Sequence, residues 1–390
     1  MKQAVYLDNA ATTPVRPEVL EAMLPYLRAD KFGNPSSAHR YGREARAGVE
    51  DARRRIADAL GVESRQIVFT SGGTEADNLA VVGGTLAARS KGAPFRVAVS
   101  TIEHKAVLAA AHTVEEMGAD VTTVPVDSCG RVEPDAVTAA LESGLGLMSI
   151  MWVNNEIGAV QDIPAIAEAA HSRGITFHTD AVQAVGKIPC TFSEIACTCA
   201  TISGHKIGAA KGIGALIVRD KSAVEPILHG GQQQQGVRPG TENVPGIVGL
   251  AIAVELAVSE LEEIAPALSH LRNRFEEGIR AAVPDVVIHA ADAPRAPHIT
   301  NVSIPGTDTE TMLMHLDLAG IACSSGSACT TGSVEASHVM NALGVDRELG
   351  ESALRFSLSK STSTDDIDYV LQELPAITRK VRKLAGVLGR

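Results

Sequence analysis

The sequence predicts an α/β fold in which a mainly parallel sheet lies between two layers of helices. Between about residues 66 and 219, short apolar runs alternate with helix-like segments, a pattern typical of strands joined by helical crossovers. The runs are apolar along their whole length, as expected for strands buried on both faces. We expect strands at 66–70, 96–100, 148–153, 174–180, 198–202 and 214–218, with helices that begin at Thr74, Glu103, Ile163 and Ala181.

The pattern changes after Ser259, where a smaller α+β domain is expected. It opens with an amphipathic helix at about 265–282, which has Pro266 in its first turn, where proline is tolerated. Strands are expected near 298–304, 321–324 and 354–358, followed by a capped helix near Thr364. We therefore assign residues 16–260 to a large domain, and residues 1–15 together with 261–390 to a small domain.

Composition and charge exclude several classes of protein. The 390-residue chain has a formal net charge of -11 and no basic stripe, so we expect no direct nucleic acid binding. The apolar stretch 247–258 is too short to cross a bilayer, so we expect a buried helix and no membrane contact. No apolar signal-peptide core follows Met1, and the six cysteines lack the spacing of a disulfide scaffold. A cytoplasmic protein is expected.

Lys206 is the most informative residue of the chain. It follows the β-branched run 198–202 in the sequence Ser203-Gly204-His205-Lys206. A lysine at the mouth of a buried strand can be desolvated enough to hold an aldehyde as a Schiff base. Asp180 ends another expected strand, and a carboxylate there can keep a pyridine nitrogen protonated. A solvated lysine and a helix N-cap would explain this pair alone, but with the other strand ends it predicts pyridoxal 5'-phosphate.

Polar residues follow each of the five expected strands from 66–70 to 198–202. Ligands of α/β sheets bind beyond the carboxyl ends of strands, so these residues are expected to share one site. The turn 71–74 offers backbone N–H groups to a phosphate, and His104 could stack on a planar cofactor and move protons. The other strand ends carry Asn154, Asn155, Gln183, Ser203 and His205. Ordinary capping would explain any one of these features, but their combination indicates a binding site.

A run of small residues surrounds Cys329, at about 324–335. Such a segment cannot anchor itself by hydrophobic packing, so it is expected to be mobile. A cysteine on it could move between a buried cofactor and an external acceptor. An ordinary flexible loop with an incidental thiol is the alternative explanation.

Over essentially its whole length, the sequence resembles the cysteine desulfurases of the NifS/IscS-like group in the class V aminotransferase superfamily. The matching stretches are 7–14, 33–37, 70–75, 103–105, 153–158, 178–183, 203–206, 238–243, 325–329 and 354–357. So many ordered matches are highly specific. The resemblance implies a PLP-dependent transferase fold of type I, a homodimer and pyridoxal phosphate as the cofactor.

The resemblance also implies a role for each matching residue near the cofactor. Lys206 would bind the aldehyde, Asp180 the pyridine nitrogen and Gln183 the ring oxygen, with His104 stacked on the ring. The phosphate would be held by Gly73, Thr74, Ser203 and His205, and by Thr241 from the other subunit.

On the substrate side, the resemblance implies that Asn155 and Arg355 bind a carboxylate, Arg355 as a bidentate fork. Asn34 is also expected among the substrate-binding residues. Catalysis would depend on Lys206, His104 and Cys329. The implied reaction converts L-cysteine to L-alanine, leaves a persulfide on Cys329, and passes the sulfur to an acceptor protein in iron–sulfur cluster assembly or another thio-modification pathway.

Some cysteines and glutamines depart from the pattern of relatives or carry no assigned role. Gln233-Gln234-Gln235 stands where many relatives have a charged Gln-Glu-Arg segment, so a charge pair near the cofactor entrance or the dimer contact is missing. Cys323 stands where an aliphatic residue is common and is expected to end a buried strand. Cys197 and Cys199 are expected to be core residues, so no metal site is predicted.

Two other functions fit parts of this pattern. A selenocysteine lyase or an aminotransferase of the same fold is the alternative enzyme, although an aminotransferase has no use for a mobile Cys329 segment. A binding protein that holds a sulfur acceptor without turnover is the alternative of another class. Lys206, Asp180, His104 and Cys329 together argue against it. The sequence leaves the identity of the sulfur acceptor open.

Overall fold

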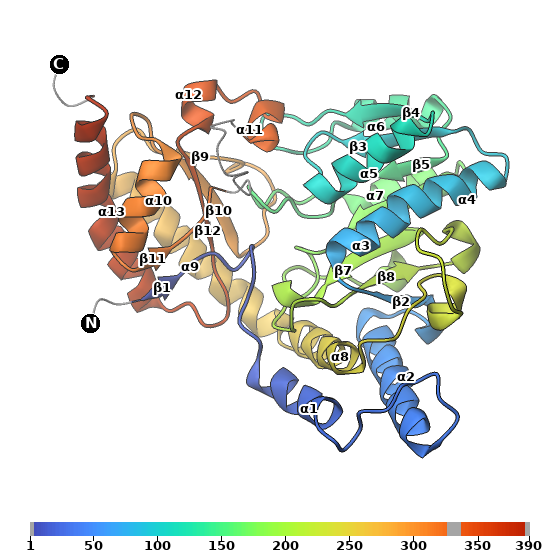
Figure 1. Cartoon of the computed structure of the whole chain (residues 1–390). Coiled ribbons are helices and arrows are strands. Elements are labelled where there is room, and N and C mark those ends of the chain that lie inside the picture. The colour runs from blue at the N-terminus through green and yellow to red at the C-terminus, as the bar shows by residue number, and fades with distance from the viewer. Residues whose placement is uncertain (1–3, 326–336, 387–390) are drawn as a thin grey trace.

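The computed structural model describes residues 4–325 and 337–386. Figure 1 shows two parts side by side: one contains β2 to β8, and the other contains β1 and β9 to β12 with α9, α10 and α13. The expected α/β architecture is confirmed.

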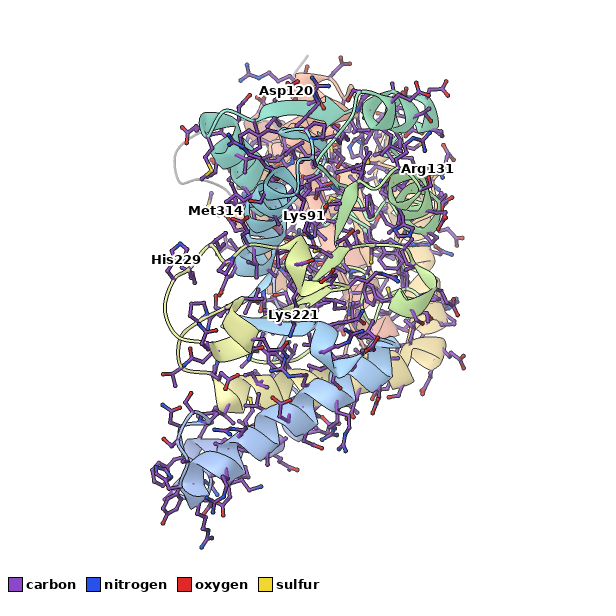
Figure 2. All side chains as sticks on the ribbon, turned by 90° about the vertical axis from the view of Figure 1, so that its right-hand side faces the viewer. Lys91, Asp120, Arg131, Lys221, His229 and Met314 are labelled. Carbon is purple, nitrogen blue, oxygen red and sulfur yellow. The ribbon has the colours of Figure 1, made fainter. Side chains whose placement is uncertain are left out.

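The larger part is built on a seven-stranded sheet in the order β2-β8-β7-β6-β5-β3-β4. Neighbouring strands are parallel except that β8 is antiparallel to both β2 and β7. The strands are β2 (Ile67–Thr70), β3 (Arg96–Ser100), β4 (Asp120–Val124), β5 (Leu147–Ser149), β6 (Thr176–Asp180), β7 (Cys199–Ser203) and β8 (Gly214–Val218). Strand β4 was not expected, because it lies at an edge and is largely exposed; Asp120 marks it in Figure 2.

Successive residues of the central strands face opposite layers of helices. In β8, Ala215 and Ile217 join a buried cluster with residues of α2 and α8, whereas Leu216 and Val218 join a cluster with residues of α3. The first layer contains α1 (Pro17–Leu27), α2 (Arg40–Leu60), α6 (Pro134–Glu142), α7 (Ile163–His171) and α8 (Val244–Ser259). The second contains α3 (Gly73–Asn78), α4 (Gly84–Ser90) and α5 (Lys105–Glu116). Both faces of the sheet are therefore covered, as the apolar runs predict.

The smaller part contains a three-stranded antiparallel sheet, β12-β10-β9, and a parallel pair, β1-β11. Its strands are β1 (Val5–Tyr6), β9 (Val287–Ile288), β10 (Ile299–Ser303), β11 (Ile321–Ala322) and β12 (Ala353–Ser357). Its helices are α9 (Leu261–Ala282), α10 (Thr309–Leu318), α11 (His338–Ala342), α12 (Arg347–Gly350) and α13 (Thr364–Leu384). The N-terminal segment completes this part, because β1 pairs with β11. Since Ala290, Ala296 and Val339 pack in the larger part's main cluster, the domain boundaries stay a prediction.

Two expected helices differ from the structure. The segment after Ala181 forms consecutive turns instead of a helix, because Gly186 adopts a φ of 70° and Pro189 follows. Helix α9 begins at Leu261, so Pro266 lies inside the helix and not in its first turn. Helices α8 and α9 are bent by 70° relative to each other. In the described residues, no single helix is long and apolar enough to cross a membrane, and only this bent pair reaches that length and composition together.

Side chains cover the free edge of β2. Gln234 Oε1 accepts hydrogen bonds from the Phe69 N–H (3.0 Å) and from Arg53 Nη1 (3.1 Å). Arg53 Nη1 also donates to the Ile67 carbonyl, at 2.5 Å. Gln234 and Gln235 have φ values of 47° and 59°, a region that side-chain-bearing residues rarely adopt. The glutamine run thus has a buried member, Gln234, that is bonded to the edge strand and to Arg53.

Candidate active site

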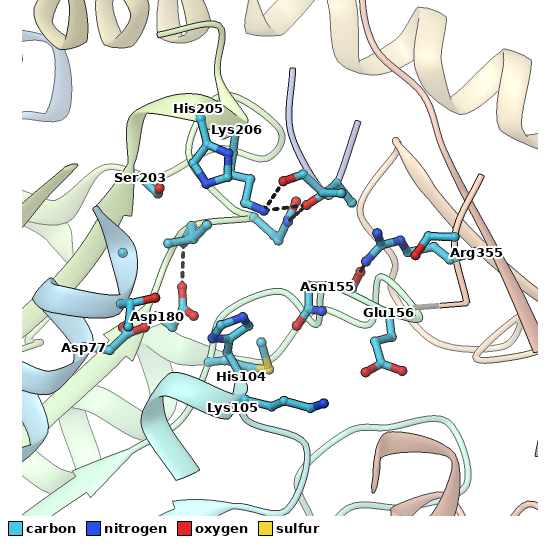
Figure 3. Close-up of a pocket in the computed structure, with 18 of the residues that line it drawn as sticks. Asp77, His104, Lys105, Asn155, Glu156, Asp180, Ser203, His205, Lys206 and Arg355 are labelled. Carbon is cyan, nitrogen blue, oxygen red and sulfur yellow. Dashed lines mark hydrogen bonds between the residues drawn. The ribbon is translucent and has the colours of Figure 1, made fainter. Parts of the chain in front are cut away.

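A cavity of about 360 Å³ lies beyond the carboxyl ends of β6 and β7, where they meet the N-terminal segment and β12 (Figure 3). Its lining includes Ala10 and Ala11 of the N-terminal segment. The predicted site residues that line it are Gly73, Thr74, His104, Asn155, Asp180, Gln183, Ser203, His205, Lys206 and Arg355. The structure therefore brings the strand ends and Arg355 together in one cavity.

Lys206 follows β7 in a short 3-10 turn. Its Nζ donates hydrogen bonds to the carbonyls of Ala10 (2.8 Å) and Ala11 (2.7 Å). Burial lowers the pKa of Lys206 to about 8, and Arg355 acts in the same direction. An amine with such a pKa is partly unprotonated near neutral pH, so it can act as a nucleophile.

Asp180 is the last residue of β6, and its side chain is buried at the cavity wall. Its Oδ1 accepts a hydrogen bond from the Val182 N–H at 2.8 Å. Burial raises the pKa of this carboxyl, while His104, the Val182 N–H and Lys206 lower it. A buried carboxylate that faces a cavity suits a protonated ring nitrogen, because the two opposite charges would neutralise each other.

His104 is the N-cap of α5, and its Nδ1 accepts a hydrogen bond from the Ala106 N–H at 3.1 Å. A neutral ring in this position therefore carries its hydrogen on Nε2. Burial lowers the pKa of His104, although Asp180 opposes the shift. The imidazole is thus largely neutral at physiological pH and can exchange a proton with a ligand in the cavity.

The predicted phosphate-binding residues lie at the start of α3 and the end of β7. A Cβ atom at Gly73 would lie 3.1 Å from Val182 Cγ2 and 3.4 Å from Ser203 Cβ, so any larger residue here would require these neighbours to shift and would narrow the corner. His205 Nδ1 lies 3.1 Å from Thr12 Oγ1, and burial lowers the pKa of His205 to about 4. A neutral imidazole, the Ser203 and Thr74 hydroxyls and free backbone N–H groups can all donate to an anion.

The donors of Arg355 are largely bonded within the protein. Nη2 donates to Asp8 Oδ1 and Nη1 donates to the Asn155 carbonyl, both at 2.8 Å. Its Nε is buried and has no hydrogen-bond partner among the described residues. Figure 3 shows the guanidinium close to Asn155. A carboxylate ligand would therefore have to share or displace the Asp8 contact.

Gln183 is also bonded on both sides. Its Nε2 donates to the Ala10 carbonyl at 2.9 Å, and its Oε1 lies 3.0 Å from His298 Nε2. Because burial lowers the pKa of His298 well below its usual value, His298 is neutral and donates to this oxygen. The predicted contact of Gln183 with a ring oxygen stays a prediction.

Two predicted site residues, Asn34 and Thr241, lie outside the cavity of their own chain. Asn34 is exposed and its Oδ1 accepts from the Ser36 N–H, because the chain there turns into α2, with Gly33 packed closely on the Tyr41 carbonyl. Thr241 is exposed and outside the lining of its own chain. Cys329 lies outside the described residues. The roles of all three stay predictions.

The cavity also contains polar residues to which the sequence assigns no role. Asp77 of α3 lies beside Asp180, and Glu156 follows Asn155. Glu156 Oε2 accepts from Ser337 Oγ at 2.5 Å, and His338 Nε2 donates to the Glu103 carbonyl at 2.9 Å. Asp77 lies one turn beyond the 71–74 phosphate turn, so helical periodicity could have indicated it. Nothing in the sequence places His338 near the cavity.

Of the other described cysteines, Cys197 and Cys199 are buried, and Cys129, Cys190 and Cys323 are partly buried. Burial raises the pKa of Cys197 to about 11 and that of Cys199 and Cys323 further. Cys323 packs against the core of the smaller part, directly after β11. Within residues 4–325 and 337–386, no group of three His, Cys, Asp or Glu residues could hold a metal ion.

The chain matches the family model described as Aminotransferase class-V over residues 5–370, and it belongs to this family. Within it, the chain groups with the cysteine desulfurases. It is 43% identical to the cysteine desulfurase IscS of Dictyoglomus turgidum over 99% of this chain and 97% of the relative. It is 44% identical to the cysteine desulfurase IscS of Methanosarcina thermophila, over 98% of this chain and 94% of the relative.

Solved structures give the same result. A NifS-like protein superimposes with a TM-score of 0.90 and 35% identity, covering 97% of this chain and all of that chain. SspA, solved in complex with cysteine, superimposes with a TM-score of 0.79 and 34% identity, over 92% of this chain and 99% of that chain.

Class V aminotransferases and cysteine desulfurases use pyridoxal phosphate, and it is the cofactor of this chain. The cavity residues fit it. A partly buried amine with a lowered pKa stands at one side, a buried carboxyl at the other, and a glycine corner with hydroxyl and imidazole donors suits the phosphate.

Proposed function

We propose that this chain is a pyridoxal-phosphate-dependent cysteine desulfurase that converts L-cysteine to L-alanine and transfers the sulfur to Cys329. The observation that carries the proposal is the meeting of Lys206, Asp180 and Arg355 in one cavity. A lysine that can hold an aldehyde and an arginine that can hold a carboxylate together suit an α-amino acid. The names of the desulfurase relatives and the cysteine bound to SspA support the choice of substrate.

Bound pyridoxal phosphate supplies an electron sink that weakens the bonds at the α-carbon of an amino acid. The residues of the chain bind, orient and transfer protons. Lys206 Nζ holds the cofactor and later acts as an acid or base, Asp180 stays anionic beside the ring nitrogen, and His104 exchanges a proton through Nε2. Arg355 fixes the substrate carboxylate, with Asn155 beside it.

Sulfur transfer requires a nucleophile that the cofactor does not supply. The Cys329 thiolate attacks the substrate sulfur, so that an S–S bond forms and the substrate C–S bond breaks. The bonding electrons stay on the carbon, which takes a proton and becomes the methyl group of alanine. The outer sulfur of the persulfide then passes to a sulfur-acceptor protein. The partly buried Cys323 thiol is poorly suited to this part, because desolvation raises its pKa far above neutral.

We further propose that two copies of the chain form a dimer in which Thr241 and Asn34 face the partner's cavity. Both side chains are exposed and outside the cavity of their own chain. The α1–α2 end projects from the molecule in Figure 2 and exposes the apolar side chains of Leu27, Phe32 and Tyr41. The loop with His229, which leads toward Thr241, also extends from the body in that view.

The function is tested by incubating the purified holoenzyme with L-cysteine. Equal amounts of alanine and reductant-released sulfide are expected, and adding a keto acid should not increase alanine. Keto acid consumption without sulfide would show an aminotransferase instead. Selenocysteine as the substrate, in parallel, tests the lyase alternative.

The dimer is tested by sedimentation and by mixing inactive variants. Co-expressed Lys206→Ala and Thr241→Lys subunits should regain part of the activity, because one cavity of the hybrid would keep its own lysine and receive an intact partner threonine. A monomeric, fully active chain would contradict the dimer and leave the desulfurase assignment untouched.

A further inference from the structure

Three carboxyl groups are buried around the cofactor end of the cavity: Asp77, Glu103 and Asp180. Their exposed fractions are 1%, 0% and 5%. Figure 3 shows the Asp77 and Asp180 carboxyl groups next to one another. Three neighbouring anions in so little solvent would repel strongly, so most of these groups must be neutral.

Among the described residues, no positively charged side chain stabilises a negative charge on Asp77. Its Oδ1 is buried and without a hydrogen bond among the described residues. The nearest imidazole nitrogen, His178 Nε2, lies 3.7 Å away, too far for a hydrogen bond. The Thr201 hydroxyl is the one group that favours the anion, while burial, Asp180 and Glu103 all raise the pKa of Asp77.

His178 cannot supply the missing positive charge. Its Nδ1 lies 2.8 Å from Ser149 Oγ and its Nε2 lies 3.0 Å from Thr201 Oγ1, so hydroxyl groups already use both ring nitrogens. Burial lowers the pKa of His178 to about 3. The imidazole is therefore neutral.

Glu103, like Asp77, has a buried carboxyl oxygen without a hydrogen bond and a raised pKa. Its Oε1 accepts from the Met151 N–H at 2.7 Å and from Ser100 Oγ at 2.5 Å, but its buried Oε2 has no partner in the described part of the chain. Burial raises the pKa of Glu103 to about 8. Asp180 has more groups that favour its anion. It accepts a hydrogen bond from the Val182 N–H, and His104 and Lys206 both lower its pKa.

We propose that Asp77 is a positioning residue that keeps a proton at neutral pH, so that the negative charge of the carboxyl cluster is confined to Asp180. Asp77 then supports Asp180 by packing and by its dipole and adds no second anion. The cofactor's ring nitrogen meets one carboxylate of fixed position, and the cavity stays close to neutral in its deepest part.

The charge state of Asp77 is tested by infrared difference spectroscopy on the holoenzyme at neutral pH. Asp77→Asn should remove a carboxylic acid C=O band and leave the carboxylate bands unchanged. Glu103→Gln is the matched control and should remove a second acid band, whereas Asp180→Asn should remove a carboxylate band. Loss of a carboxylate band in Asp77→Asn would overturn the proposal.

The positioning role is tested by the dissociation constant of pyridoxal phosphate. Asp77→Asn keeps size and neutrality, so its affinity should stay within about threefold of wild type, whereas Asp180→Asn should weaken binding by about tenfold or more. Asp77→Ala should bind pyridoxal phosphate more weakly than Asp77→Asn does, because alanine no longer packs against Asp180. Weakening in Asp77→Asn as large as in Asp180→Asn would show that Asp77 acts as an anion.

A variant that leaves Asp77 in place keeps the proposal testable if the Asp77 substitutions misfold. Thr201→Val removes the hydroxyl that lowers the pKa of Asp77, so the acid band should persist to higher pH than in wild type. Disappearance of the band at lower pH in Thr201→Val would contradict the assignment.

Discussion

The cofactor end and the substrate end of the cavity are built differently. Lys206, Asp180 and His104 follow strands of one sheet or begin the next helix, and within the described residues no side chain of opposite charge is bonded to them. Arg355 lies on β12 of the smaller part and is already paired with Asp8 of the N-terminal segment at 2.8 Å. The first end is ready to receive its ligand, whereas the second must exchange an internal ion pair for an external carboxylate.

This difference has a physical basis. Strands of one sheet hold their ends in fixed relative positions, and a neutral or desolvated group there needs no counterion. A buried guanidinium, in contrast, requires an anion whenever the substrate is absent, because an unpaired buried charge is strongly unfavourable. Asp8 supplies that anion, so substrate binding at Arg355 is a competition.

The largest effect is expected for Lys206→Ala, which removes the amine of the cofactor end. Alanine formation should fall by at least roughly a thousandfold, because Lys105, the other amine in the described cavity lining, extends toward Glu156 and away from Lys206 in Figure 3. Borohydride reduction followed by mass spectrometry should find the cofactor on Lys206 of the wild type.

Lys187→Ala is the matched control, because burial also lowers the pKa of Lys187 to about 8, although it lines a different cavity. It should retain the cofactor. Labelling of Lys187 or Lys211 in the wild type would refute the assignment of Lys206.

Cys329→Ser should block sulfur transfer while leaving cofactor binding and substrate binding in the cavity intact. Cofactor binding and the spectral change on adding L-cysteine should persist, while alanine release nearly stops, because a hydroxyl cannot form a persulfide. Sulfur-labelled cysteine should place a reductant-sensitive adduct on Cys329, and Cys323→Ser should change turnover far less. Wild-type rates in Cys329→Ser would mean that sulfur is eliminated directly at the cofactor.

Arg355→Ala should act mainly on substrate binding. Loss of a desolvated guanidinium–carboxylate contact worth about 2 kcal/mol corresponds to a rise in KM of about thirtyfold. Asp8→Asn should have the opposite sign and lower KM, since it removes the competing anion. Steady-state kinetics with L-cysteine measure both, and a higher KM in Asp8→Asn would show that Asp8 orients Arg355 more than it competes.

A smaller effect, on stability alone, is expected for Gln234, which lies at the edge of β2 and does not line the cavity. Gln234→Ala leaves the buried Phe69 N–H and Arg53 Nη1 without their shared acceptor, which should lower the free energy of unfolding by about 1–3 kcal/mol. Gln232→Ala, at an exposed neighbour, should be near neutral. Urea unfolding measures both, and equal midpoints would show that water replaces Gln234.

The strand-end residues of the site could be predicted because a parallel sheet forces its carboxyl ends together. The sequence alone also indicates α8 and the small-domain strands β10, β11 and β12 by their apolar patterns, but not the two-residue strand β9. It could not show that Asp8 pairs with Arg355 or that His338 reaches the Glu103 carbonyl, since these contacts join segments hundreds of residues apart. Two local features were also not predicted. Edge strand β4 was missed because it is largely exposed, and the turns after Ala181 were missed because the effect of Gly186 and Pro189 on a helix there was not recognised.

The side-chain cover over β2 has a consequence for the behaviour of the protein at high concentration. An uncovered edge strand offers its N–H and C=O groups to the edge strand of another molecule and so promotes aggregation. Here the Phe69 N–H and the Ile67 carbonyl are both occupied, by Gln234 and Arg53. Loss of Gln234 would expose the Phe69 N–H at this edge, so we expect the Gln234→Ala variant to aggregate more readily than the wild type at high concentration.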